Sequence, residues 1–99
     1  MLPVRTCSAA SLELTEAVRW DETKRPGLGG DFLDEVARTI DRLALTPEAG
    51  NPISADQRTR RLLLVRFPYQ VVYRIRKDEV VVAALAHLKR RPGYWKHRS

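Results

Sequence analysis

The sequence predicts an α+β fold of two layers, in which an N-terminal helical hairpin packs on an antiparallel sheet with a three-strand C-terminal meander. Apolar residues recur at helical spacing in the first half of the chain, and three strand-like runs with short connections fill the second half. The 99 residues suffice for one small domain, residues 1–99, and the apolar fraction of 43% is ordinary for a globular protein.

The first half of the chain predicts one short strand followed by two helices. Residues 2–7 predict an edge strand, and residues 9–24 a first helix that Ser8 or Ser11 can cap. The segment KRPGLGG, residues 24–30, breaks this helix because proline and glycine interrupt helical structure. A second helix runs from Asp31 to about Leu45, where Pro47 stops it. Its apolar stripe comprises Phe32, Leu33, Val36, Ala37, Ile40, Leu43 and Ala44.

The second half predicts the meander, after a polar loop at residues 47–58. Its three strands are residues 60–67, 69–76 and 79–88, separated by Pro68 and by a turn at Lys77 and Asp78. In the middle strand, apolar and polar residues alternate, which is typical of a strand with one buried face. We expect the helices to cover one face of the sheet, and the other face, with Arg74 and Arg76, to be basic and open.

Charge is distributed unevenly along the chain. Residues 1–50 carry 6 Lys or Arg and 9 Asp or Glu, a net charge of −3. Residues 51–99 carry 12 and 3, a net charge of +9, and the two halves sum to the total of +6. A basic half built on a sheet indicates a polyanionic partner, either a nucleic acid or an acidic protein.

Several classes of function have no support in the sequence. The single cysteine, Cys7, leaves no disulfide framework, so we expect a reducing cytoplasm and an inert buried thiol. The longest apolar run, Val80–Ala86, is too short for a membrane span, and no signal-peptide pattern opens the chain. His87 and His97 lack partners at zinc-ligand spacing, so we expect neither a metal nor another cofactor.

Four segments of the sequence resemble the RelE/ParE superfamily of type II toxin–antitoxin toxins, and its ParE-like plasmid stabilization branch most of all. These are AVRWDE, PGLGGDFLDEV, RRLLLVRFPYQVVYRI and AHLKRRPGYWKHR, which cover most of the chain in the expected order. The resemblance implies a toxin with two helices on an antiparallel sheet, held inactive by a cognate antitoxin with an acidic or amphipathic segment.

The resemblance leaves two modes of action open. ParE-like members inhibit DNA gyrase, whereas RelE-like members cut mRNA in the ribosomal A site. A third reading, outside the superfamily, is a basic nucleic-acid-binding module that is not a toxin.

Metal-free RNA cleavage needs a base, an acid and cations that stabilise the charged phosphorane. His87 is the candidate acid–base group because its intrinsic pKa lies near neutrality. The remaining candidate catalytic residues are Arg61, Arg66, Arg90 and Tyr94. In a regular strand Arg61 and Arg66 face opposite sides, so only one of them would reach the open face of the sheet.

Residues of the basic tail, with the two arginines of the middle strand, are candidates for binding the target or the antitoxin. They are Arg74, Arg76, Arg91, Trp95, Lys96 and Arg98. A structural alternative is that Tyr94 and Trp95, which follow Pro92 and Gly93, close an edge of the core instead of binding a ligand.

Overall fold

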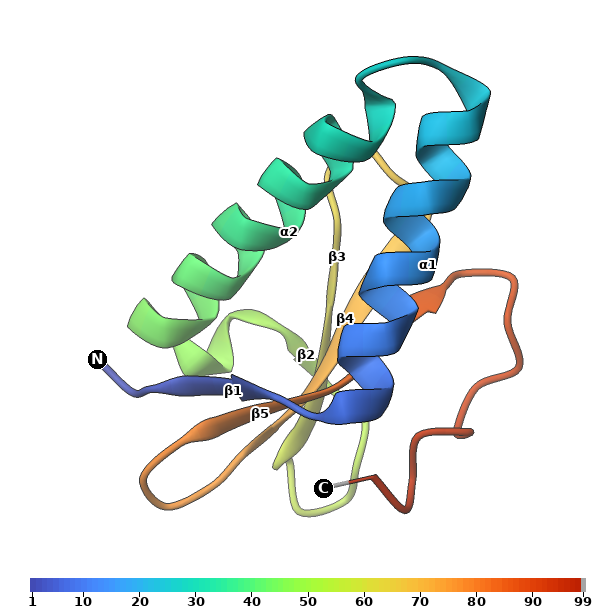
Figure 1. Cartoon of the computed structure of the whole chain (residues 1–99). Coiled ribbons are helices and arrows are strands. Elements are labelled where there is room, and N and C mark those ends of the chain that lie inside the picture. The colour runs from blue at the N-terminus through green and yellow to red at the C-terminus, as the bar shows by residue number, and fades with distance from the viewer. Residues whose placement is uncertain (99) are drawn as a thin grey trace.

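The computed structural model describes residues 1–98 and has two helices lying on one face of a five-stranded sheet (Figure 1). In chain order, the elements are β1 (Val4–Thr6), α1 (Ser8–Lys24), α2 (Leu28–Leu45), a short 3-10 helix η1 (Pro47–Ala49), β2 (Asn51–Pro52), β3 (Thr59–Leu63), β4 (Tyr69–Ile75) and β5 (Val80–His87). The predicted α+β class, the helical hairpin and the C-terminal meander are therefore confirmed. No helix of the described residues is both long enough and apolar enough to cross a membrane.

The sheet is mixed, where the sequence predicted an antiparallel one. Its strand order is β1-β5-β4-β3-β2, and β1 pairs with β5 in parallel while the other pairs are antiparallel. The parallel pair arises because the helical hairpin crosses over between β1 and the meander. The loop predicted at residues 47–58 also contains two short elements, η1 and the two-residue strand β2.

Helix α2 begins three residues earlier than predicted, at Leu28. The carboxylate of Glu22 on α1 accepts hydrogen bonds from the backbone N–H groups of Gly27 and Gly29, both at 3.0 Å. These are N–H groups that the first turn of a helix leaves unpaired, so α1 caps its neighbour. Gly29 also lets the helices approach closely, since a Cβ there would lie 2.7 Å from the Val18 carbonyl oxygen.

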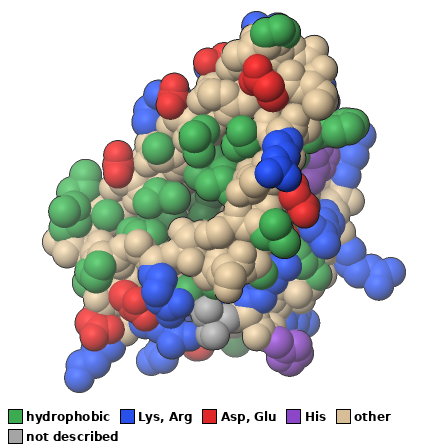
Figure 2. All heavy atoms as spheres, in the orientation of Figure 1, with side chains coloured by type: hydrophobic (Ala, Val, Ile, Leu, Met, Phe, Trp, Pro, Cys, Tyr) green, Lys and Arg blue, Asp and Glu red, His purple; other side chains and the backbone are tan. Residues whose placement is uncertain are grey.

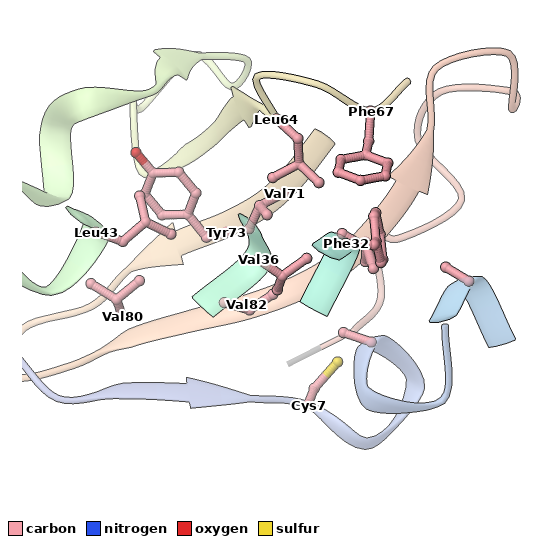
Figure 3. Close-up of a cluster of buried hydrophobic side chains, with 13 residues drawn as sticks. Cys7, Phe32, Val36, Leu43, Leu64, Phe67, Val71, Tyr73, Val80 and Val82 are labelled. Atoms are coloured by element: carbon pink, nitrogen blue, oxygen red, sulfur yellow. The ribbon is translucent and has the colours of Figure 1, made fainter. Parts of the chain in front are cut away.

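The main core lies between the helices and the sheet (Figure 3). Phe32, Val36 and Leu43 of α2 point towards the sheet side chains, and the ring of Phe67 meets Phe32 edge to face at 5.0 Å. Leu33 is 46% exposed, so the buried stripe of α2 is narrower than the sequence suggested. Cys7 is buried in this core, as expected for an inert thiol.

One extra residue in β5 decides which side chains face the helices. Val72 and Tyr73 of β4 pair with Ala84 and Val82, so Ala83 is a bulge. Before the bulge, Val80 and Val82 belong to the main core, and after it Leu85 does. His87, two residues beyond Leu85, consequently lies on the helical side of the sheet.

A second, smaller core lies on the opposite face of the sheet. Val72, Ala84 and Ala86 are buried there beneath Trp95, which is only 6% exposed. The C-terminal tail, residues 88–98, therefore covers part of the face that was expected to be open. The prediction that Trp95 closes a core edge agrees with this packing.

The hydroxyl of Tyr73 connects the sheet to the η1–β2 loop. It donates to the Pro47 carbonyl oxygen at 2.7 Å and accepts from the Gly50 N–H at 2.8 Å, and its side chain is fully buried. Tyr73→Phe should lower the free energy of unfolding by about 1–3 kcal/mol, because the buried Gly50 N–H and the partly buried Pro47 carbonyl lose their partner. Chemical denaturation measures this loss.

Tyr69→Phe is the matched control, since the Tyr69 hydroxyl has no hydrogen-bond partner among the described residues and its ring is only half-buried. An equal loss of stability in both variants would contradict the role given to the Tyr73 hydroxyl.

Candidate functional site

A groove of about 650 Å³ lies on the sheet face away from the helices, between the strands and the tail. Arg61 and Arg74 come from β3 and β4, and Arg90 and Lys96 come from the tail. These four cations, called here the groove cations, face no acidic side chain among the residues that line the groove. The arrangement favours a negatively charged ligand.

Gln70 forms part of the groove wall and is 8% exposed. Its Oε1 accepts a hydrogen bond from Arg61 at 3.3 Å, whereas no described residue accepts one from its Nε2. The Nε2 of this nearly buried side chain is therefore a hydrogen-bond donor without an acceptor among the described residues, and an anionic oxygen in the groove could accept from it.

Arg74 positions the tail against the sheet. Its Nη2 donates to the carbonyl oxygens of Trp95 at 3.1 Å and Lys96 at 2.9 Å. Because the other guanidinium nitrogens remain available to a ligand, Arg74 can both hold the tail and bind an anion in the groove.

Glu13 on α1 fixes the other side of the tail. Its carboxylate, 11% exposed, accepts from Arg98 at 2.8 Å, from the Tyr94 hydroxyl at 2.9 Å and from Arg90 at 3.4 Å. It also accepts from the backbone N–H of Leu85 at 3.1 Å, beyond the point where β1 stops pairing with β5. One carboxylate therefore joins α1, β5 and the tail.

Tyr94 is held within this cluster. Its ring lies beneath the guanidinium groups of Arg90 and Arg98, at 4.0 and 4.9 Å from the ring centroid. Burial and the hydrogen bond to Glu13 raise the pKa of Tyr94 to about 12. At neutral pH the hydroxyl stays protonated and donates to Glu13, so it is poorly placed to act as a general acid.

His87 lies away from the groove cations Arg61 and Arg74. Its ring meets Tyr69 at 5.0 Å, and Tyr69 in turn packs on Phe32 of the main core. The Nδ1 of His87 accepts the backbone N–H of Lys89 at 3.1 Å, which shapes the turn after β5. A small depression of about 220 Å³ on the helical side is lined by His87, Tyr69 and Trp20, and Arg90 reaches it as well.

The other predicted site residues are dispersed. Arg66 follows the end of β3, where it lies 3.8 Å from Asp31 and stacks over Phe67. Arg76 borders a shallow depression at the far end of β4, and Arg91 is exposed in the tail. Of the predicted catalytic set, the groove brings together only Arg61 and Arg90, and of the predicted binding set Arg74, Trp95 and Lys96.

Sequence reasoning missed Glu13 and Gln70. Glu13 lies in an early turn of the predicted first helix, where the helix dipole alone favours a carboxylate, and nothing in the sequence indicates its contacts about 80 residues away. Gln70 had a usable signal, since strand alternation places it on the same face as Arg74. Among residues 1–98, no group of three or more His, Cys, Asp or Glu side chains is arranged to hold a metal ion.

Glu13→Ala should destabilise the protein and release the tail. The change leaves Arg98, 22% exposed, without its carboxylate, so we expect a loss of about 2 kcal/mol in chemical denaturation. Limited trypsin digestion should cut faster after Lys89 and Arg90, whereas the bond after Arg91 precedes Pro92 and resists trypsin. Glu16→Ala is the control, because Glu16 is exposed on the same helix. If the tail of Glu13→Ala resisted trypsin as well as that of the wild type, the contacts of Glu13 with the tail, called here the Glu13 clamp, would not hold the tail in place.

Asp21 is a buried carboxyl near the end of α1, and its Oδ2 has no hydrogen-bond partner among residues 1–98. Burial raises the pKa of Asp21, with smaller opposing effects from Lys24 and His87. Because the pKa is higher in the folded state than in the unfolded state, this group stabilises the fold fully below the unfolded pKa and loses that contribution as pH rises through the folded pKa.

Asp21→Asn should therefore stabilise the protein at neutral pH, and the gain should shrink as the pH falls below about 4, where the carboxyl is protonated in both states. Thermal unfolding across this range measures the effect, with exposed Asp34→Asn as the control. If the stability gain of Asp21→Asn over the wild type grew towards acidic pH, the pKa of Asp21 could not be raised in the folded state.

Comparisons with known proteins agree with the fold described above. Residues 8–92 match the family model described as "ParE toxin of type II toxin-antitoxin system, parDE". A solved structure titled "Chromosomal ParDE TA system from P. aeruginosa" shares the fold, with a TM-score of 0.76 and 15% sequence identity over 88% of this chain and 96% of that chain. A search of curated proteins found no match. Because the family model spans most of the sequence, from the start of α1 into the tail, the chain belongs to the ParE family of toxins of type II toxin–antitoxin systems.

Proposed function

We propose that this toxin inhibits DNA gyrase in the cytoplasm by binding, without catalysing a reaction, and that an antitoxin with an acidic or amphipathic segment neutralises it. The observation that carries the proposal is the separation of His87 from Arg61 and Arg74. His87 packs on Tyr69 on the helical side of the sheet, and the two arginines line the groove on the other side. Cleavage of RNA would require these groups to act on the same phosphate.

The fold itself separates His87, the candidate acid, from Arg61 and Arg74. The bulge at Ala83 turns His87 towards the helices, and the hydrogen bond to Glu13 keeps the Tyr94 hydroxyl occupied. The groove contains cationic side chains and one amide donor, and these groups are suited to binding an anionic surface. This combination supports an inhibitor that docks more than it supports a nuclease.

The surface also suits an antitoxin segment with two kinds of side chain. Figure 2 shows hydrophobic side chains gathered over the helical face, and Lys and Arg side chains along the edge where the tail lies. Leu12, Trp20, Leu33 and Leu45 are among the exposed apolar residues. An amphipathic segment can cover such apolar residues while its acidic residues meet the basic tail.

The proposal predicts that the purified toxin blocks supercoiling by gyrase, that added antitoxin restores it, and that mRNA stays intact in arrested cells. In the same assays His87→Ala should keep its potency to within about twofold, since an essential acid–base group would cost about 10²–10⁴ in rate. His97→Ala is the matched control, because His97 is exposed.

Two results would contradict the proposal. Unimpaired supercoiling by wild-type toxin would exclude gyrase as the target. Ribosome-dependent mRNA cleavage that His87→Ala abolishes, in a variant whose unfolding curve is unchanged, would establish the nuclease in its place.

A further inference from the structure

We infer that the groove on the open sheet face binds the sugar–phosphate backbone of a single DNA strand. The choice of DNA rests on the proposed function, since gyrase holds DNA while it works. The groove itself supplies the chemistry, which is that of a phosphate-binding surface with no base-reading elements.

The groove carries a concentrated positive charge. The four groove cations, Arg61, Arg74, Arg90 and Lys96, converge from two strands and the tail, and no lining residue is acidic. In the adjoining cluster the Glu13 carboxylate partners Arg98 and contacts Arg90, but it does not reach Arg61, Arg74 or Lys96. A ligand with several regularly placed negative charges is needed to balance this groove.

The two arginines of the sheet lie at a spacing that suits neighbouring phosphates. Arg61 pairs across the strands with Val72, so Arg74 is its diagonal neighbour on the same face. Diagonal neighbours in an antiparallel pair lie about 7–8 Å apart, which is comparable to the separation of successive phosphates along one nucleic-acid strand. Arg61 keeps its Nε and Nη2 for one phosphate, because its contact with Gln70 uses Nη1. Arg74 keeps its Nε and Nη1 for the next phosphate, because its contacts with the tail use Nη2. Arg90 and Lys96 face both from the tail.

The groove wall also holds a neutral donor, the side-chain amide of Gln70. Gln70 is more than nine-tenths buried, yet its Nε2 lacks a partner among the described residues and the side chain lines the groove. A phosphate oxygen held by Arg61 would lie within reach of the Gln70 amide, because Arg61 already contacts the Oε1 of that amide.

None of the described residues that line the groove offers a platform on which a base can stack. Trp95 is 6% exposed and covers Val72 and Ala84, and Tyr94 is enclosed by two arginines. Binding should therefore be independent of sequence and dominated by counterion release. An acidic peptide is less well matched, because its charges depend on flexible side chains and lack the fixed repeat of a phosphate backbone.

The test measures fluorescence anisotropy of labelled single-stranded oligothymidylate over a range of salt concentrations, with toxin freed from its antitoxin. Four phosphate contacts predict a slope of about −2.8 in log K against log salt. Arg61→Ala/Lys96→Ala should reduce the slope to about −1.4 and lower the affinity roughly tenfold or more at about 0.1 M salt. These substitutions leave Arg74 and the Glu13 clamp in place.

Arg58→Ala/Lys77→Ala is the matched control, since it removes the same charge from exposed residues outside the groove. The control should bind DNA like wild type. An equal loss in both double variants would overturn the groove as the site. If oligoglutamate bound more tightly than oligothymidylate, the assignment of the ligand as a phosphate backbone would be wrong. If a DNA duplex bound as tightly as oligothymidylate, the assignment to a single strand would be wrong.

Gyrase assays run in parallel separate this inference from the proposed function. Wild-type toxin that inhibits supercoiling but binds no oligothymidylate would overturn the inference alone. Toxin that binds oligothymidylate through the groove yet leaves supercoiling unimpaired would support the inference and overturn the proposed function. If both hold, the Arg61→Ala/Lys96→Ala variant should inhibit supercoiling more weakly than the Arg58→Ala/Lys77→Ala control.

Discussion

At Ala83, strand β5 carries one residue more than its neighbour β4, and the arrangement of both faces of the sheet follows from this bulge. A bulge leaves backbone groups without ladder partners. Here the Ala83 carbonyl oxygen accepts from the Cys7 thiol at 3.4 Å and from Arg98 at 3.2 Å. Residues from the two ends of the chain therefore stabilise the same irregular point in the middle of the sheet.

The bulge also separates the chemistry of the two faces. It sends Leu85 and His87 towards the helices, and it gives Ala84 and Ala86 to the small core under Trp95. Alanines at these positions leave room for the large indole close to the sheet. The tail can then lie near enough for Arg74 to reach its carbonyl groups and for Glu13 to reach Arg98.

Local patterns in the sequence were sufficient to predict the helical hairpin, the meander and the alternation of β4, because each depends on residues close together in the chain. The position of His87 relative to the arginines could not be predicted in the same way. The run Val80–Ala86 is apolar throughout, so it has no alternation in which an extra residue would show. Likewise β3 ends at Leu63, before Arg66, and only tertiary contacts such as that of Glu35 with the Val65 N–H at 3.3 Å account for the path that follows.

The contacts that complete the groove join residues far apart in the order of synthesis. Glu13 is made early, whereas Tyr94 and Arg98, its partners, follow 81 and 85 residues later. Chains fold from the N-terminus as they emerge from the ribosome, so the hairpin and much of the sheet can form while the tail is still being made. The nascent toxin would thus lack one wall of its groove until translation has passed Arg98. A cell that makes this protein therefore meets the finished groove only after this last stretch has been made, when the cognate antitoxin can bind the folded toxin at once.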